Sequence, residues 1–373
     1  MRIRKNLTGK WVVVLVLVIL ADGVLWSQYS LSRHPAKPDR GSPATFTGKP
    51  LTGQEAVRPG LPSPPTAAPS PVVPPPDELL RRMPAAKFPR PAATWLEAQI
   101  ELSRRAFSCG SIDGVGGSQS VAALRAFQES ENLPVTGRLD PATCARLVLP
   151  SPPFLRISLT AEDLAGLQPL SPTWLGKSAK AVLAYETALE LVAERTHAHP
   201  ALLRQLNPAI DWTAIAPDTS LTVPAIGRVA VNTKAAQLHL SLGEHVLEAV
   251  DDAGRLIAHF PVSIARDVEK RHVGELHVTV IIPNPDYTFD PDVFPESEEG
   301  RKLGRKLILP PGPNNPVGVA WIGLDRPGYG IHGTPAPEQV GRTESHGCFR
   351  LANWDALTLV DLAWVGLPVY VDP

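Results

Sequence analysis

The sequence predicts a multidomain chain that ends in a mainly antiparallel β domain, preceded by two small helix-rich units and a proline-rich linker. Prolines crowd the region before residue 95, apolar residues recur at helical spacing from there to about 225, and strand-like alternation follows from 228. With 373 residues and 43% hydrophobic residues, the chain has room for two or three domains with real cores. Its 36 Lys and Arg nearly balance its 37 Asp and Glu, which leaves no polyelectrolyte footprint for nucleic acid.

Residues 1–30 have the pattern of a signal peptide or a signal anchor. Four cationic residues lie before or at position 10, an apolar run covers 11–21, and no acidic residue precedes Asp22. The apolar run is shorter than the roughly 20 residues that span a bilayer, and no clear cleavage site follows it. A cleaved signal and an uncleaved inner-membrane anchor therefore both stay open. In either case we expect the rest of the chain to be exported to the periplasm or cell envelope.

A Pro-rich disordered linker is predicted over residues 31–94. Sixteen prolines lie between Pro35 and Pro91, and the only aromatic residues in that stretch are Phe46 and Phe88. Such a composition buries too little apolar surface to offset the entropy of ordering, and proline runs favour an extended conformation. We expect a semi-rigid tether.

Residues 95–150 are predicted to fold as a small helical bundle with one glycine-rich loop. Apolar residues at helical spacing predict a helix over 120–129, and Asp140 followed by Pro141 is typical of a helix start. Cys109 and Cys144 lie in this unit, and in an exported protein two cysteines of one small module are expected to form a disulfide. The alternative is a pair of unpaired thiols.

This unit resembles the three-helix peptidoglycan-binding domain. The resemblance is carried by Ile112-Asp113-Gly114, by Ala126-Phe127-Gln128, and by Thr136-Gly137 with Leu139-Asp140. It implies attachment to the cell wall rather than chemistry.

A second unit is predicted over residues 180–226, after a linker over 151–179. Helices are expected over 187–196 and 200–206, with a weak first strand over 180–185 and a closing strand over 220–223. The Leu206-Asn207-Pro208 and Val223-Pro224 segments resemble those of a LysM module, a βααβ fold that binds N-acetylglucosamine polymers. An ordinary helical linker is the alternative.

Residues 228–373 show period-two alternation that predicts an antiparallel β domain of many short strands. One concentrated group of reactive residues lies in it: His332, then Ser345-His346-Gly347-Cys348 and Arg350. A thiol becomes a nucleophile when a neighbouring base or cation stabilises the thiolate, and histidine is the usual base. Both His332 and His346 are candidates for that base. A zinc site formed by His332, His346 and Cys348 is an alternative, although a fourth ligand is not evident.

These residues resemble the signature of the L,D-transpeptidase (YkuD-type) catalytic domain. The spacing of His332 from the Ser-His-Gly-Cys box lies near the short end of the family's range, and the segments 315–318, 321–324 and 366–371 support the match. The resemblance implies that Cys348 is the nucleophile, that His332 is the general base, and that the Gly333 carbonyl orients the imidazole. It further implies that Ser345, His346 and Gly347 shape the substrate and oxyanion pocket and that Arg350 faces a substrate carboxylate.

The sequence therefore predicts a peptidoglycan L,D-transpeptidase that forms 3→3 crosslinks through a cysteine acyl-enzyme, with no metal or organic cofactor. Its expected partners are peptidoglycan stem peptides and glycan, and the inner membrane if the N-terminal segment is uncleaved. The same site could serve an L,D-carboxypeptidase or the attachment of a wall protein. A non-catalytic wall-binding adaptor is the alternative from another class.

Overall fold

The computed structural model describes residues 87–373 except 228, 230, 232, 295 and 344–346. The expected signal segment over 1–30 and the linker up to residue 86 lie outside the described residues. Among the helices that are described, none has both the length and the apolar character needed to cross a membrane.

The first folded module is a helical bundle closed by a short strand pair. Thr94 and Asp140 cap two of its helices, each accepting a hydrogen bond from the backbone N–H three residues on, and Pro141 begins the last helix as predicted. The module starts earlier than expected, because Arg90 pairs with Leu149 and Ala92 is buried, although both residues fall in the predicted linker. Its elements are β1 (Arg90–Pro91), α3 (Trp95–Arg104), α4 (Ser118–Ser130), α5 (Pro141–Arg146) and β2 (Val148–Leu149).

Gln128 explains part of the sequence pattern of this module. Its fully buried amide donates to Thr136 Oγ1, Thr143 Oγ1 and the Arg138 carbonyl, and its Oε1 accepts from Gly137 N. One side chain therefore joins α4 to the turn and helix that follow.

The predicted disulfide between Cys109 and Cys144 is wrong. Cys109 is a buried thiol among the apolar residues of the bundle, whereas Cys144 lies half-buried on the short helix α5. A disulfide needs Cβ atoms about 3.8 Å apart, and membership of one small module does not supply that proximity.

The second module contains a strand pair and four short helices, and its first strand differs from the expected one. No strand forms over 180–185, because the backbone N–H of Leu183 donates to Pro311 O and its carbonyl accepts from Asn314 N, both in the catalytic domain. The closing strand pairs instead with residues from the predicted linker over 151–179. The elements are β3 (Phe154–Ser158), α6 (Ala161–Ala165), α7 (Trp174–Ser178), α8 (Ala188–Arg195), α9 (Pro200–Leu206) and β4 (Ser220–Pro224).

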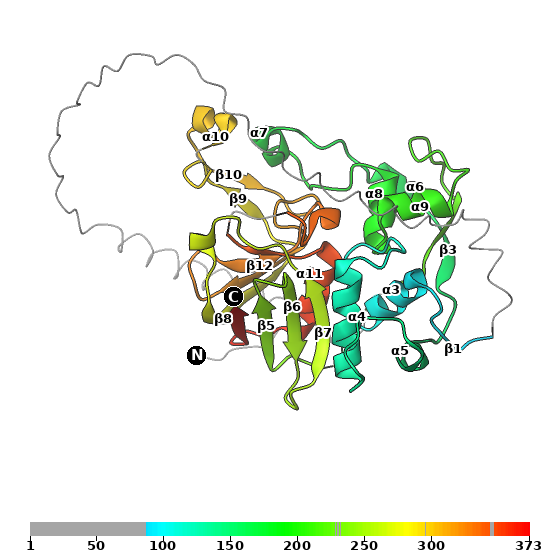
Figure 1. Ribbon diagram of the computed structural model, residues 1–373. Helices are drawn as coiled ribbons and strands as arrows, with labels where there is room; N and C mark the ends of the chain where they lie inside the picture. Colours follow the sequence, from blue (N-terminus) through cyan, green and yellow to red (C-terminus); the bar gives the residue numbers. More distant parts are fainter. Residues whose placement is uncertain (1–86, 228, 230, 232, 295, 344–346) are drawn as a thin grey trace, which may run out of the picture. The chain divides into compact units, whose positions relative to one another are not determined.

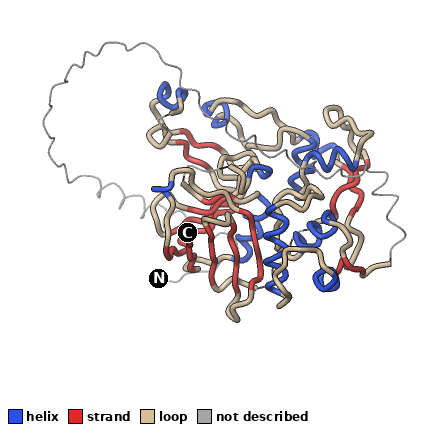
Figure 2. The backbone as a smooth tube through the Cα atoms, in the orientation of Figure 1, coloured by secondary structure: helices blue, strands red, loops and turns tan. Residues whose placement is uncertain are grey.

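The C-terminal domain is built on an eight-stranded sheet in the order β13-β12-β11-β8-β14-β5-β6-β7 (Figures 1 and 2). Neighbouring strands are antiparallel except for the pairs β14–β5 and β12–β13, so the mainly antiparallel prediction is confirmed. The strands are β5 (Gln237–Ser241), β6 (Val246–Val250), β7 (Leu256–Pro261), β8 (Gly274–Pro283), β11 (Ala320–Leu324), β12 (Gly330–His332), β13 (Phe349–Arg350) and β14 (Pro368–Asp372). Helix α11 (Asn353–Leu362) packs against β8, β11 and β12.

A separate hairpin extends from this sheet and is held by the second module. Strands β9 (Tyr287–Phe289) and β10 (Leu307–Leu309) flank helix α10 (Glu298–Leu303). Trp174 of α7 stacks on Phe289 with ring centroids 4.4 Å apart, and the Glu299 carboxylate accepts from the N–H groups of Trp174 and Leu175. Helix α7 therefore fixes the hairpin, as Figure 1 shows at its upper edge.

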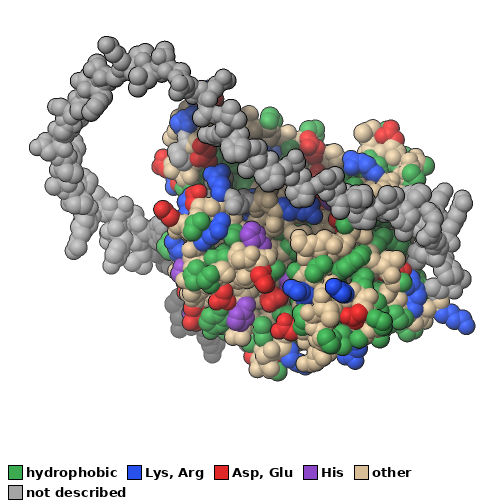
Figure 3. All heavy atoms as spheres, viewed as in Figure 1, with side chains coloured by type: hydrophobic (Ala, Val, Ile, Leu, Met, Phe, Trp, Pro, Cys, Tyr) green, Lys and Arg blue, Asp and Glu red, His purple; other side chains and the backbone are tan. Residues whose placement is uncertain are grey.

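The helical bundle also packs against the sheet. Helix α4 lies beside β7 (Figure 1), and His259 of β7 exchanges backbone hydrogen bonds with Ala106 and Ser108. Ser108 Oγ also donates to the buried Asp355 carboxyl group of α11 at 2.9 Å. On the face of the molecule seen in Figure 3, acidic and basic side chains are interspersed rather than segregated.

Candidate active site

His332 ends strand β12 and is held by the next residue. Its Nδ1 lies 2.6 Å from the Gly333 carbonyl oxygen, and its ring stacks on Trp321 of the neighbouring strand with centroids 5.7 Å apart. A carbonyl oxygen can only accept, so Nδ1 must carry the proton and Nε2 keeps its lone pair. This tautomer leaves Nε2 free to accept a proton from a nucleophile.

Burial keeps the His332 imidazole uncharged. The side chain is 6% exposed, and burial lowers its pKa to about 4, which the positive charge of Arg350 reinforces and the bond to Gly333 opposes. The imidazole is therefore neutral near pH 7 and able to act as a base.

Cys348 comes to the same face of the sheet as His332 through a parallel strand pair. Ile331 pairs with Phe349 and His332 with Arg350. Ile331 and Phe349 are 0% and 1% exposed, so they point into the core. Because side chains alternate along a strand, Cys348, His332 and Arg350 project to the opposite face. The pairing of β12 with β13 thus brings together residues sixteen positions apart.

The Cys348 thiol rests in its protonated form. Its Sγ donates to the Gly328 carbonyl at 3.3 Å, and burial raises its pKa, with the Arg350 guanidinium and a backbone bond from Gly330 acting in the opposite direction. A protonated thiol beside a neutral imidazole requires proton transfer at the moment of attack.

Two tyrosines lie close enough to Cys348 to feel the negative charge of its thiolate. Tyr287 comes from the β9–β10 hairpin, and burial followed by the charge of Cys348 raises its pKa to about 12. Tyr329 precedes β12, and burial raises its pKa as well. Its hydroxyl donates to Lys270 O and accepts from His272 N, which fixes the ring beside the nucleophile. No role for either residue was predicted from the sequence: Tyr329 directly precedes the Gly330-Ile331-His332 segment, whereas Tyr287 lies far from that segment in sequence.

The structure describes only one of the three remaining predicted site residues, Gly347. Gly347 immediately precedes Cys348, and a Cβ placed on it would meet nothing within 4 Å. Ser345 and His346 lie outside the described residues. In the described part of the chain no three His, Cys, Asp or Glu side chains gather as a metal site would require.

The loop after Gly333 is held from both sides. Gln119 of α4 donates to the Val340 carbonyl at 2.7 Å, and Gly341 N donates to Ser263 Oγ at 2.9 Å. The helical bundle therefore contacts the segment that joins the base to the nucleophile.

Asn353 is the most consequential residue that the sequence did not reveal. It begins α11 and is 1% exposed, and its Oδ1 accepts from Val319 N at 3.2 Å while its Nδ2 donates to Pro313 O at 3.2 Å and to Glu194 at 2.9 Å. A Cβ on Gly333 would lie only 2.2 Å from Asn353 Oδ1. In the sequence, Asn353 is only an asparagine three residues after Arg350. Its contacts become evident only in the folded structure.

Comparison with known proteins agrees with these observations. Residues 235–371 match the model of the "L,D-transpeptidase catalytic domain", and residues 92–147 match that of the "Putative peptidoglycan binding domain". A Bacillus licheniformis protein named "Putative L,D-transpeptidase YkuD" is 26% identical over 50% of this chain and 94% of its own length. A Fuscovulum blasticum protein named "Putative L,D-transpeptidase in ATP synthase subunits region ORF 5" is 30% identical over 42% of this chain and 92% of its own length.

Among solved structures, an L,D-transpeptidase from Mycobacterium smegmatis is 19% identical over 42% of this chain and 71% of that chain, with a TM-score of 0.30, which adds nothing to the assignment. The family assignment rests on two findings. Residues 235–371 match the family model, and the Fuscovulum blasticum relative is 30% identical over 92% of its own length. The chain belongs to the L,D-transpeptidase family and carries a peptidoglycan-binding domain ahead of its catalytic domain.

Proposed function

We propose that Cys348 and His332 carry out peptidoglycan transpeptidation that yields 3→3 crosslinks. The observation that carries the proposal is the hydrogen bond from His332 Nδ1 to the Gly333 carbonyl, which leaves Nε2 as a base on the face of the sheet that also presents Cys348. A base oriented by a third group beside a nucleophile is the arrangement that acyl transfer requires.

The first half of the reaction acylates the enzyme. His332 Nε2 takes the thiol proton as Cys348 Sγ attacks the carbonyl carbon of the diaminoacyl residue in a donor tetrapeptide stem. Backbone N–H groups beside Cys348 are proposed to stabilise the developing oxyanion. The C–N bond then breaks, His332 returns the proton to the leaving amine, and D-alanine departs from a thioester.

The second half transfers the acyl group to an acceptor. The amine of a second stem loses a proton to His332 and attacks the thioester, which forms the new amide and restores the thiol. Arg350 lies on the same face and supplies a fixed positive charge for a substrate carboxylate. Ser345 and His346, adjacent in sequence to Gly347, are proposed to complete the pocket.

The accessory parts of the chain are proposed to deliver this site to its substrate. The matched peptidoglycan-binding domain supports binding to the wall, and the second module is proposed to be LysM-like and to bind glycan. The family supports a location in the cell envelope. The basic and apolar N-terminus supports export, with membrane anchoring if it is not cleaved.

Intact mass spectrometry of the full-length protein tests the proposal. The chain is incubated with a carbapenem, and separately with disaccharide tetrapeptide. A covalent adduct mapped to Cys348, together with a crosslinked dimer that lacks one D-alanine, is expected. A trimmed tripeptide alone would shift the assignment to an L,D-carboxypeptidase. Absence of any adduct on folded protein would favour the wall-binding adaptor. Full turnover by Cys348→Ala would refute the mechanism.

A further inference from the structure

Asn353 links the second module to the residue that orients His332. Both hydrogens of its amide are used, one toward Glu194 Oε1 of α8 and one toward the Pro313 carbonyl, and its oxygen is used by Val319 N. The acceptors on one side and the donor on the other fix which end of the amide is oxygen. A side chain held at three points in the core has one orientation.

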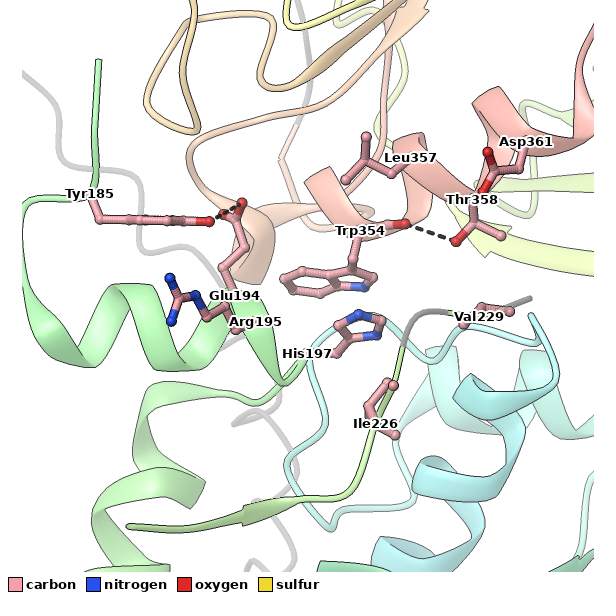
Figure 4. Close-up of a pocket in the computed structure, with 11 residues that line it drawn as sticks. Tyr185, Glu194, Arg195, His197, Ile226, Val229, Trp354, Leu357, Thr358 and Asp361 are labelled. Atoms are coloured by element: carbon pink, nitrogen blue, oxygen red, sulfur yellow. Dashed lines mark hydrogen bonds between the residues drawn. The ribbon is translucent and has the colours of Figure 1, made fainter. Parts of the chain in front are cut away.

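The far end of this link is itself anchored. Glu194 Oε1 accepts from the Tyr185 hydroxyl at 3.1 Å as well as from Asn353, and Figure 4 shows the Tyr185 hydroxyl pointing at this carboxylate. Both residues line a cleft of about 450 Å³ between the second module and α11. A carboxylate that accepts two hydrogen bonds here has its rotamer set by its partners.

The near end of the link touches the catalytic backbone. Asn353 Oδ1 lies against Gly333 and Gly318, so closely that a Cβ on either would approach it to 2.2 Å or less. Gly333 supplies the carbonyl that accepts from His332 Nδ1. Asn353 therefore packs against, and limits the position of, the backbone whose carbonyl sets the tautomer and the ring orientation of the base.

A second contact between the same module and the catalytic domain bypasses this backbone. Glu190, one turn before Glu194 on α8, accepts from Asn314 Nδ2 at 2.6 Å. Its other bonds come from Glu186 N and Thr187 N at the start of the same helix. Among the described residues, the hydrogen bonds of the Glu190 side chain involve neither Gly333 nor Asn353.

We propose that Glu194 is a positioning residue for catalysis, acting through Asn353 and Gly333 on His332, so that the second module is part of the catalytic apparatus. The proposal rests on the assigned roles of His332 and Cys348. In this proposal the second module contributes to the catalytic rate as well as to wall attachment.

The test measures alkylation of Cys348 by iodoacetamide as a function of pH, resolved by peptide mass spectrometry so that Cys109 and Cys144 do not interfere. It is run on the full-length protein together with kcat and KM for transpeptidation. Glu194→Leu removes the acceptor, Glu194→Gln keeps an acceptor oxygen, and Glu190→Leu is the matched control on the same helix. Because a general base contributes about 10²–10⁴-fold, its partial misplacement should slow both alkylation at pH 7 and kcat by about tenfold while KM changes less than twofold.

Glu194→Gln should recover the rate to within about threefold, and Glu190→Leu should lower the melting temperature without changing the alkylation profile. Wild-type alkylation and kcat in folded Glu194→Leu would overturn the proposal. Equal slowing in Glu190→Leu would also overturn it, because module docking alone would then explain the effect. If Glu194→Leu does not fold, Tyr185→Phe decides: a two- to threefold slowing supports the proposal, and an unchanged rate refutes it.

His332→Ala separates this inference from the proposed function. If His332→Ala alkylates at the wild-type rate, the assignment of the base is wrong whatever Glu194 does. If His332→Ala slows alkylation and Glu194→Leu does not, only the positioning role of Glu194 fails.

Discussion

Replacing Gly333 by alanine should damage both stability and catalysis, because the position has no room for a side chain. The new Cβ would lie 2.2 Å from Asn353 Oδ1 and 3.2 Å from Val319 N. Asn353 cannot retreat without breaking its bonds to Val319, Pro313 and Glu194. Overpacking of this kind costs about 1–3 kcal/mol, and each displaced hydrogen bond adds about 1 kcal/mol.

The expected loss of unfolding free energy is therefore about 2–4 kcal/mol, since the clash and at least one lost bond add. Thermal unfolding should show it as a lower melting temperature, by about 1–2 °C for each kcal/mol in a chain of this size, because the unfolding entropy is about 2.1 cal/mol/K per residue. The displaced carbonyl also releases His332 Nδ1, so kcat should fall by about 10²-fold or more while the protein remains folded at 25 °C.

Gly227→Ala is the control for a glycine substitution that adds no clash, because a Cβ at Gly227 meets nothing within 4 Å. A double-mutant cycle with Asn353→Ala identifies the clash: the two substitutions together should cost less than the sum of their separate costs. A Gly333→Ala protein with the melting temperature and kcat of the wild type would refute the reasoning, as would strict additivity in the cycle.

Three further outcomes follow from the buried titratable groups. Burial raises the pKa of Asp355 to about 8, so the folded protein retains a proton that the unfolded chain has lost. The free energy of unfolding should therefore fall as pH rises from about 4 to 8. Asp355→Asn should flatten this pH dependence in urea unfolding, and an unchanged slope would contradict the assignment. Cys144 should react with a thiol reagent under non-reducing conditions well before buried Cys109, whose pKa burial raises, whereas an intact disulfide would leave both unreactive. Because the pKa of His332 is lowered to about 4, the acid limb of Cys348 alkylation should lie near pH 4, and a midpoint near 6.5 would show that the imidazole is not buried as described.

Local patterns in the sequence predicted much of the fold because they report on short-range physics. Period-two alternation predicted the mainly antiparallel sheet, and the Asp140–Pro141 pair predicted the start of α5. Patterns of this kind do not identify a strand's partner. The strand expected over 180–185 was wrong because Leu183 bonds to the catalytic domain, and residues 154–158 took the place beside β4.

The candidate site was predicted as far as its reactive residues are close in sequence or belong to a recognisable motif. The motif predicted Cys348 and His332 as the reactive pair, and the family resemblance implied the contact of His332 with the Gly333 carbonyl that the structure contains. The contact between Glu194 and Asn353 could not be found, because 159 positions separate the two residues and neither belongs to a motif. The predicted disulfide failed for a related reason, since membership of one module does not specify the distance between two side chains.

The position of β14 in the sheet has a consequence for how the enzyme is made. This strand is the last of the sheet in the chain, yet it lies between β8 and β5 and joins the half of the sheet that bears β12 and β13 to the other half. On a growing polypeptide, the ladder that aligns His332 with Arg350 therefore lacks its central support until residues 368–372 have been synthesised. A chain shorter than this would carry the complete Cys348 segment without the strand that joins the two halves of the sheet.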